Sequence, residues 1–78
     1  MRDLPDDDDW LTDRQRDVGR RVEAERVRQN LTQEALYLAA RVDRRTLQNL
    51  EAGSANPTLG TLSRIAYVLD VPISDLVR

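Results

Sequence analysis

Four polar side chains at helical spacing carry chemistry that suits the edges of DNA bases: Arg44, Arg45, Gln48 and Asn49. An arginine guanidinium can bridge the two acceptors of guanine in the major groove, and a glutamine or asparagine amide can bridge the donor and the acceptor of adenine. The four residues lie at the start and in the middle of a predicted helix, 44–52, where side chains reach base edges when a helix enters the groove. A solvated polar face would have the same composition, so this pattern alone leaves both interpretations open.

Other kinds of chemistry are disfavoured by the residues that the chain lacks. Its 78 residues include no cysteine and no histidine, which removes disulfides, the common metal sites and the usual nucleophile–base pairs. We therefore expect no catalytic residues, no metal and no cofactor, and a protein that is not an enzyme. No apolar run approaches the ~20 residues that cross a bilayer, and the amino terminus is acidic rather than a basic signal sequence, so a soluble cytoplasmic protein is expected.

The net charge of −2 combines two segments of opposite sign. Residues 1–13 contain six aspartates and one arginine, whereas residues 14–78 contain eleven arginines and eight acids. The sequence thus predicts an acidic, disordered tail over residues 1–12 and a mildly basic domain over residues 13–78. All twelve basic residues are arginine, which is typical either of phosphate and guanine recognition or of codon bias in a GC-rich genome.

Five short helices, and no strand, are predicted to position these side chains. The first helix is expected to begin beside Asp13 and to carry a sparse apolar stripe of Val18, Val22 and Val27. It should end near Asn30, which can take the left-handed cap conformation.

The second and third helices are joined by about three residues, an arrangement found in helix-turn-helix units and also in helical bundles. Thr32 is expected to cap the second helix, which runs to about Ala40, and Asp43 the third, which Gly53 closes. The residues expected to face the core from these two helices are Leu36, Ala40, Leu47 and Leu50.

A fourth helix follows the turn Asn56-Pro57 and is expected to be capped by Thr58. Pro72 breaks the chain again, and Ser74 is expected to cap a final turn. The apolar residues of these elements, four of them at the spacing of one buried helix face, are Leu62, Ile65, Ala66, Leu69 and Leu76.

Several short segments fall in the order and at the spacing of a known family. They are Leu31-Thr32-Gln33-Glu34, Val42, Thr46-Leu47, Leu50-Glu51-Ala52-Gly53, Asn56-Pro57-Thr58, Ile65-Ala66 and Leu69-Asp70-Val71. Over roughly residues 18–77 the chain resembles the Cro/repressor-type helix-turn-helix domain, also called the XRE family. The resemblance implies an all-α, lambda-repressor-like fold of five short helices, with the helix-turn-helix at helices 2 and 3, and sequence-specific binding of double-stranded DNA by residues 13–78.

The resemblance also assigns a role to each residue that matches the family pattern. The base-reading positions correspond to Arg44, Arg45, Gln48 and Asn49. The positions that contact backbone phosphate, aided at the start of the second helix by its positive end, correspond to Thr32, Gln33, Thr46, Ser54 and Asn56.

Two further residues, Arg26 and Glu51, match a family ion pair that holds the first helix to the recognition helix. The alternative, an ordinary exposed acid at position 51, is disfavoured because an unpaired acid beside DNA would repel phosphate. Two positions depart from the family: Tyr37 replaces a small residue, and Arg41 replaces a turn glycine. A non-glycine residue in the left-handed conformation expected at position 41 costs about 1 kcal/mol.

These features predict a transcriptional regulator, by preference a repressor, that reads the major groove with helix 44–52. A restriction–modification controller or a phage switch protein would share the pattern. One module makes few base contacts, so we expect a homodimer on an inverted repeat. The dimer face would include Tyr67, Val68, Ile73 and Val77, unless these residues complete the core.

The alternative function is a protein-interaction module, or an antitoxin-like partner, without specific DNA binding. The arginines of the third helix disfavour it, because the centre of a protein-binding surface is depleted in charge.

The acidic tail leaves three interpretations open. Asp6 to Asp9 could fold back onto the basic reading surface and compete with DNA, the tail could bind a protein partner, or it could only keep the protein soluble. Trp10 and Leu11 either dock onto the first helix or are exposed.

Overall fold

Five α-helices make up the structure, a computed structural model that describes all of residues 1–78, and no strand is present. The helices are α1 (Asp9–Arg28), α2 (Gln33–Ala40), α3 (Arg44–Glu51), α4 (Leu59–Leu69) and α5 (Ser74–Val77). The predicted fold class is therefore confirmed. None of the helices is long and apolar enough to cross a membrane.

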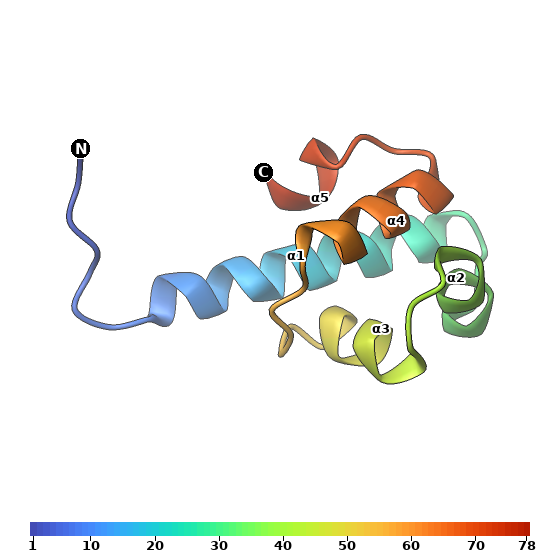
Figure 1. Cartoon of the computed structure of the whole chain (residues 1–78), viewed down its shortest axis with the longest axis horizontal. Helices are drawn as coiled ribbons and strands as arrows, with labels where there is room; N and C mark the ends of the chain where they lie inside the picture. The colour runs from blue at the N-terminus through green and yellow to red at the C-terminus, as the bar shows by residue number, and fades with distance from the viewer.

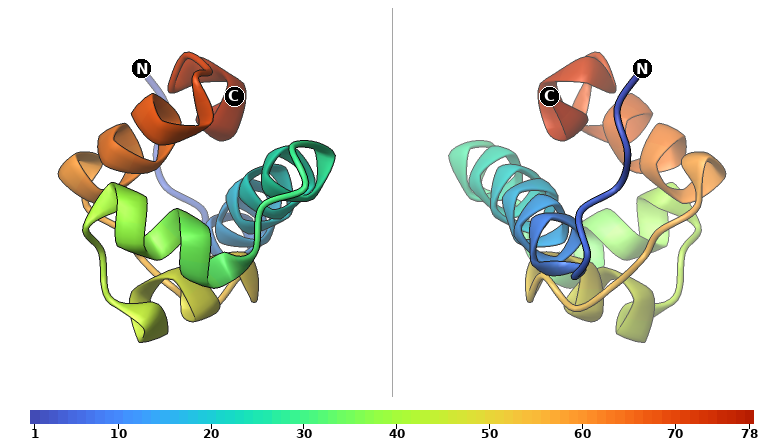
Figure 2. Two further views of the ribbon diagram at one scale, coloured as in Figure 1. Left: turned by 90° about the vertical axis from the view of Figure 1, so that its right-hand side faces the viewer. Right: turned by 90° about the vertical axis from the view of Figure 1, so that its left-hand side faces the viewer.

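Helix α1 runs along the long axis of the molecule, and the four shorter helices gather around its carboxy-terminal part (Figure 1). It packs against α3, α4 and α5, while α2 packs against α3 and α4. The end views in Figure 2 show α1, α4 and the α2–α3 pair enclosing a common centre. Hydrogen bonds fasten distant segments to α1: Gln29 Nε2 donates to the Leu69 carbonyl at 2.7 Å, and Arg21 donates to the carbonyl of Arg78.

Eleven buried apolar side chains fill this centre. The sequence predicts all eleven of them and one further position that is not buried. The eleven are Val18, Val22, Leu36, Ala40, Leu47, Leu50, Leu62, Ile65, Ala66, Leu69 and Leu76. The prediction for Val27 is wrong, since 55% of that residue is exposed. At about 100° per residue, Val27 lies some 180° around the helix from Val18, so a stripe that buries Val18 and Val22 turns Val27 to solvent.

The start of α1 was predicted too late, because the helix begins at Asp9 rather than beside Asp13. The amides of Leu11 and Thr12 donate to the Asp8 carbonyl at 3.0 and 3.1 Å. Aspartates at a helix amino terminus interact favourably with its exposed N–H groups and its positive end. The helix thus begins inside the acidic run, although the Asp8 side chain makes no cap hydrogen bond, and Trp10 lies in its first turn with 42% exposure. The division into a tail, 1–12, and a domain, 13–78, stays a prediction.

The ends of the helices combine expected and unexpected conformations. Asn30 (φ 60°) and Gly53 (φ 76°) adopt the left-handed conformation expected of them, and Thr32 and Thr58 accept the predicted cap hydrogen bonds at 3.0 and 3.1 Å. Asp43 precedes α3 but its side chain makes no cap hydrogen bond. The residue before α5 is Ile73, so Ser74 is the first helical residue instead of the predicted cap.

Candidate nucleic-acid interface

The outer face of α3 presents four polar side chains that have no partner within the protein. Arg44, Arg45, Gln48 and Asn49 are all exposed, and their side chains make no hydrogen bond or ion pair in the structure. The opposite face buries Leu47 and Leu50 almost completely. These two leucines, three residues apart, fix the rotation of the helix about its axis, so the polar face can only point outward.

Helix α3 forms one edge of the molecule, as both Figures 1 and 2 show. In Figure 1, α2 lies on one side of it and the loop 52–58 on the other. Two guanidinium groups and two carboxamides therefore project from an edge that nothing else in the chain covers. Such an arrangement can donate to guanine and can both donate to and accept from adenine.

The backbone of α3 is held against α1 at a contact that only glycine allows. A Cβ atom at Gly19 would lie 2.3 Å from the Leu50 carbonyl oxygen and 3.2 Å from the Gly53 nitrogen. Gly19 is buried, and it lets the two helix backbones touch directly. Gly19 is not among the residues predicted from the sequence, although a glycine inside a predicted helix is a signal of close packing.

A buried ion pair ties the end of α3 to α1. Arg26 Nε and Nη2 donate to the two carboxylate oxygens of Glu51 at 2.7 and 2.9 Å, which is a bidentate arrangement. The side chains are 13% and 3% exposed, and the hydrogen bond to Glu51 raises the pKa of Arg26 against the opposing effect of burial. The third nitrogen of Arg26, Nη1, donates to the Leu31 carbonyl at 2.7 Å. These are the two residues that the resemblance pairs.

The same carboxylate also orients Gln33, the first residue of α2. Gln33 Nε2 donates to Glu51 Oε1 at 3.1 Å, which uses one of its two amide hydrogens. Thr32 is exposed, and its side-chain oxygen accepts from the Ala35 amide. The amino-terminal end of α2 therefore offers one amide hydrogen, one hydroxyl and unsatisfied backbone N–H groups to an outside acceptor.

The remaining phosphate candidates lie beside α3 or after it. Ser54 and Asn56 are exposed in the loop between α3 and α4, and Thr46 is half-buried. Ser54 is fastened to the end of α3, because its amide and its hydroxyl donate to the Asn49 carbonyl at 3.0 and 3.3 Å. The structure thus links Gln33 of α2 and Ser54 of the loop to α3, whereas Asn56 lies beside the start of α1.

The two departures from the family pattern are accommodated locally. Tyr37 is half-buried and packs against the core. Arg41 adopts the left-handed conformation with φ 57° and ψ 45°, as expected for a glycine position. The connection between α2 and α3 has the predicted length of three residues.

Comparisons with known proteins agree with this architecture. The helix-turn-helix family model matches residues 22–76. The crystal structure of the restriction-modification controller protein C.AhdI from Aeromonas hydrophila superposes with a TM-score of 0.77 at 27% sequence identity, over 80% of this chain and 94% of the controller. No curated protein sequence matches the chain.

Proposed function

The chain belongs to the helix-turn-helix family, in its XRE-type branch of DNA-binding transcription regulators, and from this premise we propose that it is a sequence-specific repressor. In this proposal α3 enters the major groove of double-stranded DNA and reads base edges with Arg44, Arg45, Gln48 and Asn49. The protein acts in the cytoplasm, where that DNA lies.

The observation that carries the proposal is the outer face of α3. Free charged and amide groups lie on a helix whose rotation and depth are fixed by Leu47, Leu50 and Gly19. A rigid element with unpaired donors costs little to order on binding. A face used to bind another protein would be expected to carry apolar or aromatic residues at its centre instead.

Phosphate contacts complete the proposed complex and set its register on the duplex. We assign them to Thr32 and Gln33 at the start of α2, to Thr46, and to Ser54 and Asn56 in the loop. Apart from the helix termini these groups are neutral, so the charge that attracts DNA comes from the arginines.

A dimer would double the number of base contacts and would read an inverted repeat with half-sites about 34 Å apart. Of the four residues predicted for its interface, Tyr67 is 87% exposed and Val77 37%, whereas Val68 and Ile73 are half-buried against the core. We therefore propose Tyr67 and Val77 as the contacts, with the other two completing the core.

The likeness to C.AhdI bears on which kind of regulator this is. The controller acts in a restriction-modification system, as its name states. This likeness supports the same role for the present chain over that of a phage switch protein.

Selection of bound sequences from a random duplex library tests the function. The expected result is enrichment of one inverted repeat, bound by two chains in sedimentation. The arginine-to-alanine variant Arg44→Ala should lose that enrichment while keeping its helical content. Recovery of no preferred sequence, with binding that depends on salt alone, would leave only the backbone interaction and would favour a protein partner for α3.

A further inference from the structure

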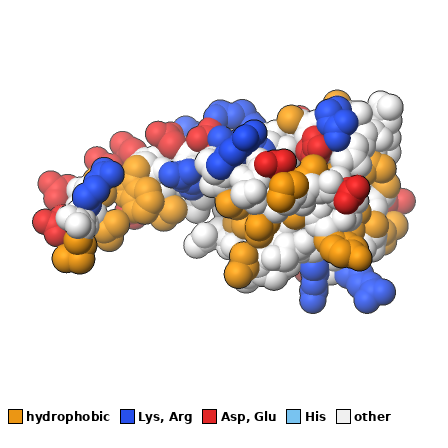
Figure 3. All heavy atoms as spheres, turned by 90° about the horizontal axis from the view of Figure 1, so that it is seen from above, with side chains coloured by type: hydrophobic (Ala, Val, Ile, Leu, Met, Phe, Trp, Pro, Cys, Tyr) orange, Lys and Arg blue, Asp and Glu red, His pale blue; other side chains and the backbone are white.

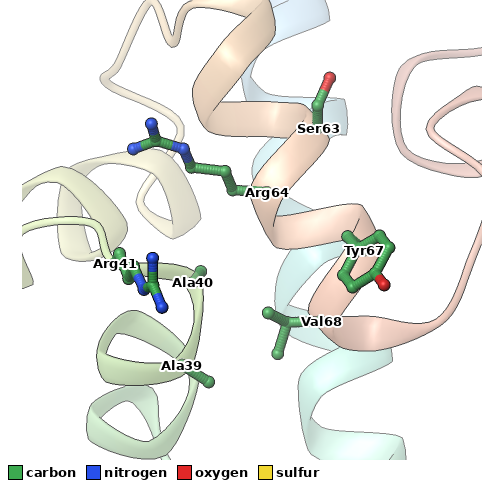
Figure 4. Close-up of a pocket in the computed structure, with 7 residues that line it drawn as sticks. All are labelled: Ala39, Ala40, Arg41, Ser63, Arg64, Tyr67 and Val68. Atoms are coloured by element: carbon green, nitrogen blue, oxygen red, sulfur yellow. The ribbon is translucent and has the colours of Figure 1, made fainter.

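A groove between α2 and α4 is not used by the proposed DNA contacts. It has a volume of about 570 Å3 and is open to solvent along one side. Val68 points from α4 toward Ala39 of α2, so the floor is apolar (Figure 4). Arg64 of α4 and Arg41, the residue that follows α2, extend their guanidinium groups over one rim, and Tyr67 stands on the other (Figure 4).

The two arginines of this groove have no partner. Neither forms an ion pair within 4.0 Å or a side-chain hydrogen bond, and both are exposed. Arg41 also keeps a left-handed backbone that glycine would adopt without strain. Strain retained at an exposed residue with no structural contact is typical of a binding role. Positive charges beside an apolar floor suit an extended segment that carries an apolar side chain between acids.

The amino-terminal tail of the chain has this pattern. Leu4, which is 76% exposed, stands between Asp3 and Asp6. Pro5 favours an extended backbone there. No aspartate of the first nine residues forms an ion pair with an arginine in the structure. The tail and the groove are therefore complementary in charge and in polarity, and the charged groups of both lack partners.

Distance prevents the tail from reaching the groove of its own chain. The tail enters α1 at Asp9, and α1 has 20 residues, which corresponds to about 30 Å. The groove runs along α4 from Ser63 to Val68, and its other wall, α2, lies at the end of the molecule opposite the tail (Figure 1). Asp6 is three residues from Asp9 and can extend only about 10 Å from it, and Asp3 about 20 Å. Figure 3 shows acidic side chains on the tail at one end of the molecule and two basic side chains projecting from the edge near the other end.

We propose that the groove of one copy binds the tail of a second copy. Asp3 and Asp6 pair with Arg41 and Arg64, and Leu4 contacts the floor at Val68 and Ala39. This contact links copies whether or not DNA is present, and it assigns the acidic tail to a second chain instead of to the DNA-reading surface.

Complementary charge reversal in the full-length chain tests the proposal without DNA. One variant carries Arg41→Glu and Arg64→Glu, and the other carries Asp3→Arg and Asp6→Arg. All four side chains are exposed, so both variants should keep the helical circular dichroism of the parent chain. Sedimentation equilibrium at low salt should show self-association weakened by about tenfold in each variant, because two exposed ion pairs become repulsive. An equimolar mixture should recover the association by pairing the two variants.

A control with the same change in charge separates this contact from a general effect of net charge. The double variant Arg20→Glu and Arg28→Glu reverses the charge of two exposed arginines of α1. It should self-associate as strongly as the parent chain. Self-association of the groove variant as strong as that of the parent chain, or a mixture that associates no better than its components, would overturn the proposal. A groove variant that associates normally but binds all duplexes more weakly would overturn it too, since Arg41 and Arg64 would then be phosphate contacts.

Discussion

Glu51 joins three segments through one buried carboxylate: Arg26 of α1, Gln33 of α2 and its own helix, α3. A negative charge at the carboxy-terminal end of a helix is unfavourable in itself, and Arg26 offsets it. The position of α3 relative to the amino-terminal end of α2 therefore depends on this residue.

Glu51→Ala is expected to lower the free energy of unfolding by about 3 kcal/mol, because it leaves the Arg26 guanidinium largely buried without its partner. Urea denaturation measures the loss. The double substitution Arg26→Met with Glu51→Leu should recover part of it, since no unpaired charge remains. Equal losses in the single and double variants would contradict this explanation. Glu25→Ala, which removes one partner of the exposed Glu25–Arg28 pair, is the control and should change stability little.

Arg41 is a second residue whose backbone and side chain have separate consequences. Arg41→Gly should raise the free energy of unfolding by about 0.5 kcal/mol, since relief of left-handed strain exceeds the added entropy of the unfolded chain. Asp70→Gly, at a second residue with φ 57°, is the matched comparison and should gain less, because aspartate tolerates this conformation better. A destabilised Arg41→Gly in thermal unfolding would show that the side chain contributes to the folded state.

The candidate residues follow from their types and family positions, and the resemblance also pairs Arg26 with Glu51, but the hydrogen bond from Gln33 to that pair could not be predicted. The sequence places Gln33 among phosphate contacts, whereas only the structure shows that Glu51 takes one of its amide hydrogens. The Gln33–Glu51 and Arg26–Glu51 hydrogen bonds join residues that are 18 and 25 positions apart in the sequence. They depend on the packing of three helices, which no local pattern contains.

At the scale of the helices, α2, α3 and α4 follow from caps and periodicity. Thr32 and Thr58 mark two starts, and Gly53 and the left-handed Arg41 mark two ends. Helix α1 was harder because its apolar stripe is only two residues, Val18 and Val22. Its first residues belong to an acidic run whose composition is typical of a disordered tail, so the start of the helix could not be predicted.

Contact between α1 and α3 should be the packing interaction most sensitive to a single methyl group. Gly19→Ala is expected to destabilise the protein by about 3 kcal/mol, since a Cβ atom would overlap the Leu50 carbonyl and the backbones would have to separate. Gly60→Ala is the matched control, because the nearest atom to its Cβ would be 3.7 Å away. It should gain about 0.5 kcal/mol from better helix propensity. Thermal unfolding measures the stability of both variants. Equal effects would contradict the explanation by close packing of α1 and α3.

At the scale of the whole molecule, charge is separated along the long axis. The acids of residues 1–13 gather at the free end of α1, and the arginines of residues 14–78 lie around the helical domain. The net charge of −2 is thus a poor guide to DNA binding, because the surface of α3 is basic locally. Affinity for any duplex should fall as salt screens these arginines.

The proposed reading of base sequence by α3 is tested by the affinity ratio between a selected duplex and a scrambled one. Asn49→Ala should lower affinity for the selected duplex by about tenfold or more, the cost of losing a bidentate base contact, and should leave the scrambled duplex unchanged. Ser54→Ala, in the proposed phosphate contacts, should weaken both duplexes equally. An Asn49→Ala variant that binds the two duplexes in the same ratio as the parent chain would contradict sequence reading by α3.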